Sequence, residues 1–284
     1  YTGRAGFYLW RRKEQKEQVI EESSAQELRN SLTNFFREQV NGTWNVSFVE
    51  LGVGKVFGWR DSLLYNPTST IKVPIAMILV QLLNEKYANE ISASDLTQIL
   101  KKNGVDGRSF DQLIHSMLVD SEEEATESCV KFIEQNGPIT EKFKNLGMEN
   151  TTYLPKRTSQ KELAICWREL FQGDILNTES KKYLQNYLKE YTENDESLLS
   201  SVTKKFSIEK PWNKEGIVFS NGLYTMQDTG VIKLGEKLYY IGISGTSSSL
   251  HPISENQLKD VIGKIIEIME KYAVAQKEKK RLDY

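Results

Sequence analysis

The stretch of sequence that decides the fold is STIKVPIAMILV, at residues 69–80. It opens on a serine, places a lysine three residues later and continues as an apolar run long enough for a buried helix. Residues three apart share one face of a helix, so the Ser69 hydroxyl and the Lys72 amine are expected to lie close together. A hydroxyl becomes a strong nucleophile when a neighbouring base takes its proton, and a desolvated lysine can be that base. The stretch therefore predicts a nucleophilic serine at a helix N-terminus.

The spacing Ser-x-x-Lys is not specific by itself. It recurs at Ser128/Lys131, Ser201/Lys204 and Ser207/Lys210. A bare match is typical of a helix N-cap followed by a solvated lysine. Only the stretch at Ser69 follows a predicted pair of strands and an Asn-Pro-Thr turn at residues 66–68, and this context selects it.

Composition excludes several classes of protein. The chain has 284 residues with 39% apolar and 27% charged side chains, enough to bury a sizeable core in one large domain or two lobes. A net charge of -2 argues against a nucleic-acid binder that depends on phosphate contacts. Two cysteines, Cys129 and Cys166, and two histidines, His115 and His251, are too few for a disulfide framework or a zinc site. We expect no metal and no cofactor.

The start of the chain leaves two interpretations open. No stretch approaches the roughly 20 apolar residues of a membrane span. Residues 6–10 read GFYLW and are followed by RRK. This pattern indicates either a juxtamembrane remnant with a membrane anchor upstream, or an aromatic patch that packs on the fold.

The order of predicted elements indicates an α/β fold of the α+β kind. Strands are expected at both ends of the chain, at 45–51, 55–59, 216–220, 230–234 and 238–244. Helices are expected at 13–39, 70–86, 93–102, 109–118, 121–136, 139–146, 158–172, 178–190, 196–204 and 254–276. We predict one antiparallel sheet built from both chain ends and flanked by helices, with an all-helical lobe and Ser69 at the junction.

The expected domain organisation follows from this order. Residues 1–24 form an N-terminal extension or the start of a helix, and residues 25–68 and 211–276 form the α/β lobe. Residues 69–210 form the helical lobe, and 277–284 form a charged tail.

This pattern resembles the penicillin-recognising serine hydrolases, the class A β-lactamases and the related D,D-peptidases. The resemblance covers residues 25–276, and its most specific element is STIKVPIA at 69–76. It implies an acyl-enzyme on Ser69, with Lys72 helping to activate the serine. It also implies a small-molecule or peptide substrate, such as one derived from peptidoglycan, and an extracytoplasmic location.

The second and third motifs of the family are degenerate here. Ser121 stands at the place of the serine of Ser-x-Asn, as a proton relay, but the third position is Glu123. The Lys-Thr-Gly motif is matched to Ser220-Asn221-Gly222, where only the glycine survives and lets a backbone approach closely. The oxyanion hole of this family uses backbone N–H groups as donors. The resemblance implies that Ser69 and Leu223 supply them in this chain.

These differences imply altered chemistry. Ser220 in place of lysine and Glu123 in place of asparagine make the pocket more negative, so anionic ligands are expected to bind weakly. Glu123 is expected to pair with Lys72 and keep it protonated. The competing interpretation places Glu122, Glu123 and Glu124 in a solvated acidic helix start.

Class A β-lactamases also carry a Glu-x-x-x-Asn loop whose glutamate activates the deacylating water. No such motif follows Gly147, and the chain is expected to enter the helix at 158 without room for that loop. A fast β-lactamase is therefore not expected.

Two functions from different classes remain. The first is a serine hydrolase that uses Ser69, Lys72 and Ser121 and acts poorly on β-lactams. The second is a catalytically inactive relative that serves as a binding or scaffolding module. An all-helical interaction protein with an incidental motif is disfavoured by the three C-terminal strands.

Overall fold

The computed structural model describes residues 30–31, 33–37, 42–52, 56–87, 96–194, 197–248 and 250–282. The expected extension at 1–24 and most of the expected helix 13–39 lie outside the described residues. The chain divides into two compact units, one of Asn41–Gly263 and one of Tyr1–Val40 with Lys264–Tyr284. The lobe boundaries expected from the sequence stay a prediction.

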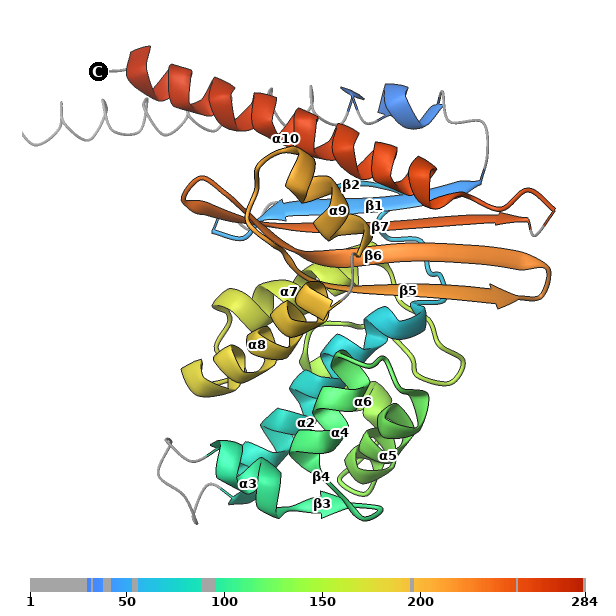
Figure 1. Ribbon diagram of the computed structural model, residues 1–284, viewed down its shortest axis with the longest axis vertical. Helices are drawn as coiled ribbons and strands as arrows, with labels where there is room; N and C mark the ends of the chain where they lie inside the picture. The colour runs from blue at the N-terminus through green and yellow to red at the C-terminus, as the bar shows by residue number, and fades with distance from the viewer. Residues whose placement is uncertain are drawn as a thin grey trace, which may run out of the picture. The chain divides into compact units, whose positions relative to one another are not determined.

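The larger unit contains a five-stranded antiparallel sheet in the order β2-β1-β7-β6-β5 (Figure 1). Its strands are β1 (Thr43–Glu50), β2 (Val56–Trp59), β5 (Trp212–Ser220), β6 (Leu223–Leu234) and β7 (Lys237–Ser248). β1 pairs with β7 in a register that runs from Thr43↔Thr246 to Glu50↔Tyr239. The two ends of the chain therefore share one sheet, and the predicted α+β fold class is confirmed.

Helix α2 is the central helix of the helical region. It spans Lys72–Tyr87, and its residues from Lys72 through Val80 are all buried. It contacts five further helices, because an apolar helix with no polar face has to be covered on every side. These are α4 (Phe110–Leu118), α5 (Glu123–Glu134), α6 (Ile139–Asn145), α7 (Gln160–Gln172) and α8 (Thr178–Asn194).

The remaining helices begin within three residues of their predicted starts, but the last of them ends six residues beyond its predicted end at 276. They are α3 (Leu96–Lys102), α9 (Leu198–Lys205) and α10 (Glu255–Leu282). Six apolar residues that share one face of the last helix are buried: Leu258, Val261, Ile262, Ile265, Ile266 and Met269. Capping side chains fix the N-termini of several helices. At α4, Ser109 and Gln112 form a reciprocal capping box.

The strands differ from prediction where polar side chains are buried. The expected strand 216–220 begins at Trp212 instead, and the expected strand 230–234 begins at Leu223. Asn213 and Lys214 in β5 are fully buried, although their polarity indicates a loop. Asn213 is accommodated because its Nδ2 donates to Asp228 Oδ1 at 2.7 Å and its Oδ1 accepts from Thr192 Oγ1 at 2.7 Å. This longer β5 changes which residues lie beside Ser69.

A short hairpin in the helical region was not predicted. Strands β3 (Gly104–Val105) and β4 (Arg108–Ser109) pair antiparallel. Two residues a strand are too few to show a period of two in the sequence. The hairpin places Arg108 directly before α4.

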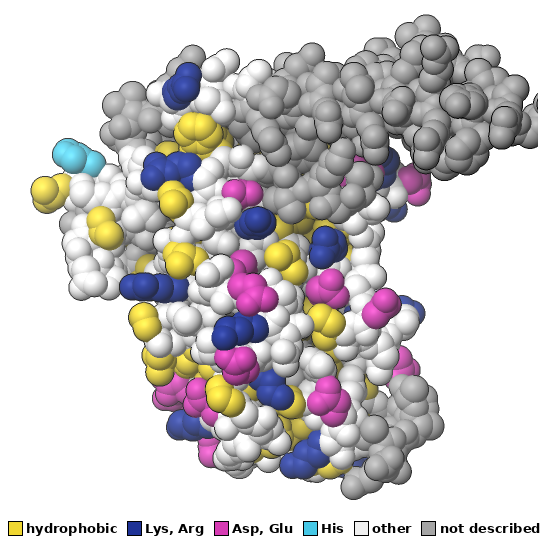
Figure 2. Space-filling model, turned by 180° about the vertical axis from the view of Figure 1, so that it is seen from behind, with side chains coloured by type: hydrophobic (Ala, Val, Ile, Leu, Met, Phe, Trp, Pro, Cys, Tyr) yellow, Lys and Arg dark blue, Asp and Glu magenta, His cyan; other side chains and the backbone are white. Residues whose placement is uncertain are grey.

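Charged side chains of both signs share the described surface. Over the part of the face in Figure 2 that the structure describes, basic and acidic side chains are interspersed. That mixture is typical of a solvent-facing surface.

Within the described ranges, with their gaps, no helix combines the length and apolar character needed to cross a membrane.

The buried central helix predicts a stability difference. Leu79 is 0% exposed and Leu250 is 84% exposed. Leu79→Ala is expected to lower the free energy of unfolding by about 2–5 kcal/mol, because it removes buried methyl groups and leaves a cavity. The control Leu250→Ala is expected to change it by less than about 0.5 kcal/mol. Urea unfolding followed by circular dichroism measures both, and equal losses would contradict the central position of α2.

Candidate active site

Ser69 lies in a short turn that leads directly into α2. The turn is the 3₁₀ helix η1 (Thr68–Ile71), and its Thr70 N–H donates to Pro67 O at 3.0 Å. Before it, the Thr68 N–H donates to Asn66 Oδ1 at 2.9 Å. Thr68 has a φ of 47°, which is unfavourable for a β-branched residue, so surrounding contacts have to hold it.

Gln227 of β6 supplies those contacts. Its Nε2 donates to Asn66 O at 3.0 Å and to Thr68 Oγ1 at 2.9 Å. Its Oε1 accepts from Thr70 Oγ1 at 3.1 Å, and its side chain is fully buried. One side chain of the sheet thus forms hydrogen bonds with residues before and after Ser69 in the sequence. Sequence reasoning missed Gln227, because nothing in the local pattern links it to a turn so far away.

Lys72 and Ser121 complete a chain of contacts to Ser69. The Lys72 Nζ donates to Ser121 O at 2.6 Å and to Ser121 Oγ at 3.4 Å. The Ser121 Oγ donates to Ser69 Oγ at 3.0 Å. Ser69 and Ser121 are partly buried, whereas Lys72 is fully buried. The structure therefore brings together the three residues expected to be catalytic.

Glu123 lies between two lysines. Its Oε2 is 3.1 Å from Lys72 Nζ, and its side chain is 49% exposed. Its Oε1 accepts a hydrogen bond from Lys156 Nζ. Lys156 belongs to residues 146–159, the segment between α6 and α7. The sequence predicted that this segment leads into the next helix without room for a loop at the site. The segment does reach the site through Lys156. Glu123 pairs with Lys72, as expected, although it also lies half-exposed in the first turn of α5, as in the competing interpretation.

Burial and charge act in opposite directions on this pair. Burial lowers the pKa of Lys72 from its ordinary value, and the negative charge of Glu123 offsets only part of that effect. Burial opposes the ionisation of Glu123, but the hydrogen bond from Lys156 and the charge of Lys72 outweigh it and lower the pKa of Glu123. Glu123 thus favours a protonated Lys72 as expected, but the effect of burial is larger and lowers the pKa of Lys72 overall.

The strand beside Ser69 is the middle of β5. A Cβ atom on Gly216 would lie 1.7 Å from Thr68 Oγ1 and 2.9 Å from the backbone N of Ser69. Only glycine permits so close an approach of two backbones. The segment of β5 that reaches the site is therefore Lys214-Glu215-Gly216.

The structure does not bring the expected segment Ser220-Asn221-Gly222-Leu223 to the nucleophile. Ser220 pairs with Leu223 across a two-residue turn, in which Asn221 and Gly222 have φ values of 52° and 72°. These values are typical of a type I′ hairpin turn with an Asn-Gly sequence. Ser220 lies four residues beyond Gly216, or about 13 Å along the strand. The glycine of a hairpin turn was mistaken for the glycine that approaches the site.

Lys214 changes the expected charge balance. It lies two residues before Gly216 and so on the same face of β5. It is fully buried, and its Nζ lies 3.8 Å from the centroid of the Tyr191 ring. The segment thus keeps a lysine where Ser220 was expected to have replaced it, and Lys156 offsets Glu123. The expected excess of negative charge is not found in this arrangement.

Comparison with known proteins identifies the family. The model of the beta-lactamase enzyme family matches residues 26–272. The chain belongs to this family and so to the penicillin-recognising serine hydrolases, as the resemblance at STIKVPIA indicated. No curated protein sequence matches the chain.

Solved structures share the fold at low sequence identity. The TLA-3 extended-spectrum β-lactamase is 19% identical with a TM-score of 0.67, and the match covers 88% of this chain and 99% of that one. A class A β-lactamase from Bacteroides cellulosilyticus is 12% identical with a TM-score of 0.65, over 88% and 98%. A variant of PBP-A, in an acyl-enzyme complex with penicillin G, is 18% identical with a TM-score of 0.65, over 88% and 97%.

The position of Gly216 predicts how two glycine substitutions differ. Gly216→Ala is expected to displace the Ser69 turn and slow labelling of Ser69 by a fluorophosphonate, by up to about 100-fold for a shift near 1 Å. Gly222→Ala is the matched control, because a Cβ there meets no atom within 4 Å. It is expected to cost some stability through its positive φ but to leave the labelling rate unchanged. A slower rate in Gly222→Ala alone would restore the expected assignment of Ser220–Leu223.

Proposed function

We propose that this chain is a serine hydrolase that acts through an acyl-enzyme on Ser69. The observation that carries the proposal is the contact chain from Lys72 through the Ser121 hydroxyl to the Ser69 hydroxyl, at 3.4 and 3.0 Å. The lowered pKa of Lys72 supports its role as the base, because a larger fraction of the amine is neutral at a given pH.

The proton path runs through Ser121. Hydroxyl hydrogens rotate, so Ser121 can accept the proton of Ser69 while it passes its own proton to Lys72. The Ser69 Oγ then forms a bond to the substrate carbonyl carbon. The proton returns from Lys72 through Ser121 to the leaving nitrogen as the carbon–nitrogen bond breaks. Water then cleaves the ester on Ser69 and releases the acid.

Two backbone N–H groups are suited to stabilise the oxyanion. One is that of Ser69, beside which Gly216 packs. The other is that of Ile217. Hydrogen-bonded and non-hydrogen-bonded pairs alternate along an antiparallel ladder, and a two-residue hairpin is closed by a hydrogen-bonded pair. Counting from Ser220↔Leu223, Ile217 falls on a non-hydrogen-bonded pair, so its N–H points away from β6. Leu223, expected in this role, instead turns its N–H toward β5.

The segment at residues 146–159 favours slow deacylation and therefore poor turnover of β-lactams. Its one carboxylate is Glu149, which is exposed. Glu162, at the start of α7, is occupied as an acceptor for Asn150 N at 2.7 Å and Thr151 Oγ1 at 2.6 Å. The side chain that the segment extends to the site is that of Lys156, which donates a hydrogen bond to Glu123.

The substrate class and location follow from the family. We propose a small-molecule or peptide amide as substrate, for example one derived from peptidoglycan, and an extracytoplasmic location. Lys214 on β5, together with Lys156, which offsets the charge of Glu123, favours a substrate that carries a carboxylate more than the sequence alone indicated. A catalytically inactive binding module is the alternative outcome of the experiment that follows.

Trapping of the acyl-enzyme tests the proposal. Incubation with penicillin G or a fluorophosphonate is expected to add one adduct, located by peptide mass spectrometry on Ser69 and absent from Ser69→Ala. The penicillin adduct is expected to persist, because deacylation is slow. Ser201→Ala, which removes another Ser-x-x-Lys serine, is the control and should label as the wild type does. Labelling that survives in Ser69→Ala would exclude this nucleophile, and an unlabelled wild type would favour the binding module.

The charges around Lys72 predict opposite shifts in the pH profile of labelling. The rate is expected to rise with pH as Lys72 loses its proton. Glu123 raises the pKa of Lys72, so Glu123→Gln is expected to move this rise to lower pH. Lys156 lowers the pKa of Lys72, so Lys156→Met is expected to move it to higher pH.

Lys144→Met is the control for that experiment, because Lys144 pairs with Glu141 on α6, at 2.7 Å. It should leave the profile unchanged. Shifts of Glu123→Gln and Lys156→Met in the same direction would show that Lys72 is not the titrating base.

A further inference from the structure

The turn that carries Ser121 directs alternate side chains to opposite sides. Ser121 and Glu123 contact Lys72. The two neighbours of Ser121 instead contact residues of β4 and α4: Glu122 forms an ion pair with Arg108, and Asp120 Oδ2 lies 3.3 Å from His115 Nδ1. Both acidic neighbours are therefore held from the side that faces away from Lys72.

Arg108 of β4 holds Glu122 through both of its terminal nitrogens. Its Nη1 donates to Glu122 Oε1 at 3.0 Å and its Nη2 to Glu122 Oε2 at 2.9 Å. A bidentate pair of this kind fixes orientation as well as distance. The Glu122 N–H also donates to Ser116 O at 2.9 Å, so Glu122 is tied to both ends of the α4 region.

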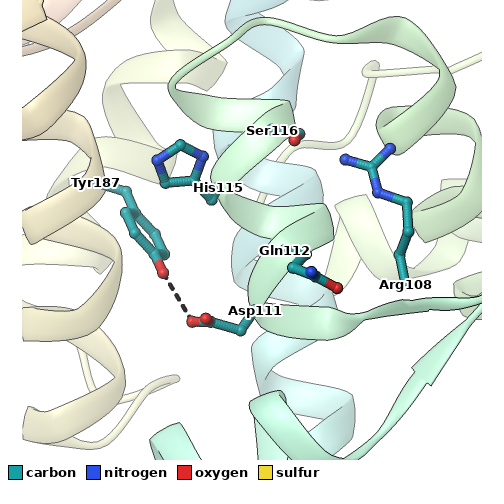
Figure 3. Close-up of a pocket in the computed structure, with 6 residues that line it drawn as sticks. All are labelled: Arg108, Asp111, Gln112, His115, Ser116 and Tyr187. Carbon is teal, nitrogen blue, oxygen red and sulfur yellow. Dashed lines mark hydrogen bonds between the residues drawn. The ribbon is translucent and has the colours of Figure 1, made fainter.

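His115 of α4 holds Asp120. Its Nδ1 lies 3.3 Å from Asp120 Oδ2, and its Nε2 lies 3.1 Å from Glu190 Oε1 of α8. The edge of the ring also packs on Tyr187, at 5.4 Å between centroids. Figure 3 shows His115 beside Tyr187, whose hydroxyl donates to Asp111 Oδ1 at 2.7 Å. Contacts with α8 thus fix the orientation of the imidazole ring, and the same ring contacts the turn at Asp120.

These two residues line one cavity. Arg108, His115 and Ser116 belong to the wall of a cavity of about 270 Å³ between α4 and α8 (Figure 3). Sequence reasoning missed Arg108, and it considered His115 only as one of two histidines, too few for a zinc site. Neither contacts Ser69, Lys72 or Ser121 in any interaction described above, so their effect has to pass through Asp120 and Glu122.

The backbone of Ser121 requires such support. Its φ is 58°, a left-handed conformation that is costly for a residue other than glycine. In this conformation the Ser121 carbonyl and hydroxyl both reach Lys72, while the hydroxyl also reaches Ser69. If the turn relaxed, these contacts would be lost together.

We infer that Arg108 and His115 are positioning residues, which hold Ser121 in its left-handed conformation by pairing with Glu122 and Asp120. The inference deepens the proposed function, because it assigns the residues that place the proton relay. Its structural part does not depend on catalysis and is tested separately.

The first experiment measures amide hydrogen exchange of the turn at residues 119–123. Arg108→Gln and Glu122→Gln are each expected to speed exchange of the Glu122 amide by about tenfold, because the turn opens more often. Glu124→Gln is the matched control, since it removes the same charge two residues after Glu122, at an exposed position in the first turn of α5. Asp120→Asn and His115→Gln, which remove the contact between Asp120 and His115, are expected to speed exchange in the same way. Unchanged exchange in Arg108→Gln, or equal acceleration in Glu124→Gln, would overturn the inference.

The second experiment measures the rate of fluorophosphonate labelling at Ser69. Arg108→Gln is expected to slow labelling by about tenfold, with a change in Tm no larger than that of Glu124→Gln. The charge-swapped double variant, Arg108→Glu with Glu122→Arg, is expected to restore most of the rate. A merely structural role would instead lower the Tm and leave the rate of the folded protein unchanged, which would also overturn the inference.

The two experiments separate this inference from the proposed function. If the wild type does not label at all but Arg108→Gln speeds exchange of the turn, the positioning role stands and the acyl-enzyme proposal fails. If the wild type labels and none of the variants alters exchange or rate, the acyl-enzyme proposal stands and the positioning role fails.

Discussion

The burial of the Lys72 ammonium is the constraint on which the rest of the site depends. A cation with no exposed surface has to find its partners inside the protein, because water cannot solvate it. Those partners are the carbonyl and hydroxyl of Ser121 and the carboxylate of Glu123. Ser121 lies in the turn between α4 and α5, and Glu123 is the first residue of α5. The position of that turn therefore decides whether Lys72 is stabilised, and with it whether Lys72 and Ser121 lie within reach of Ser69.

The sheet imposes the second constraint, on Ser69 itself. Gln227 binds the residues on either side of the nucleophile, and Gly216 allows β5 to pack directly against the turn. The site is thus held by the sheet on one side and by the α4–α5 region on the other. This division explains how one short turn can keep a strained threonine at position 68 and still present the Ser69 hydroxyl.

The sequence predicts the parts of this arrangement that are local. The apolar run after Ser69 indicates a buried helix, and the alternation of the terminal strands indicates a shared sheet. The contributions of Gln227, Lys156 and Arg108 were not predicted, because a hydrogen bond or ion pair between distant residues leaves no local period. The error at β5 has a similar cause. Buried polar residues such as Asn213 resemble a loop in sequence, so the strand was started late and its site glycine was misplaced.

The pairing of β1 with β7 has a consequence for biogenesis. The first strand leaves the ribosome about two hundred residues before its partner, since Thr43 pairs with Thr246. Contacts this distant in sequence form late and slowly during folding. The nucleophile is also among the early residues, whereas Gly216 and Gln227, which fix its geometry, arrive on the last strands. In a nascent chain, the turn around Ser69 therefore gains its contacts with Gly216 and Gln227 only after β5 and β6 have been synthesised.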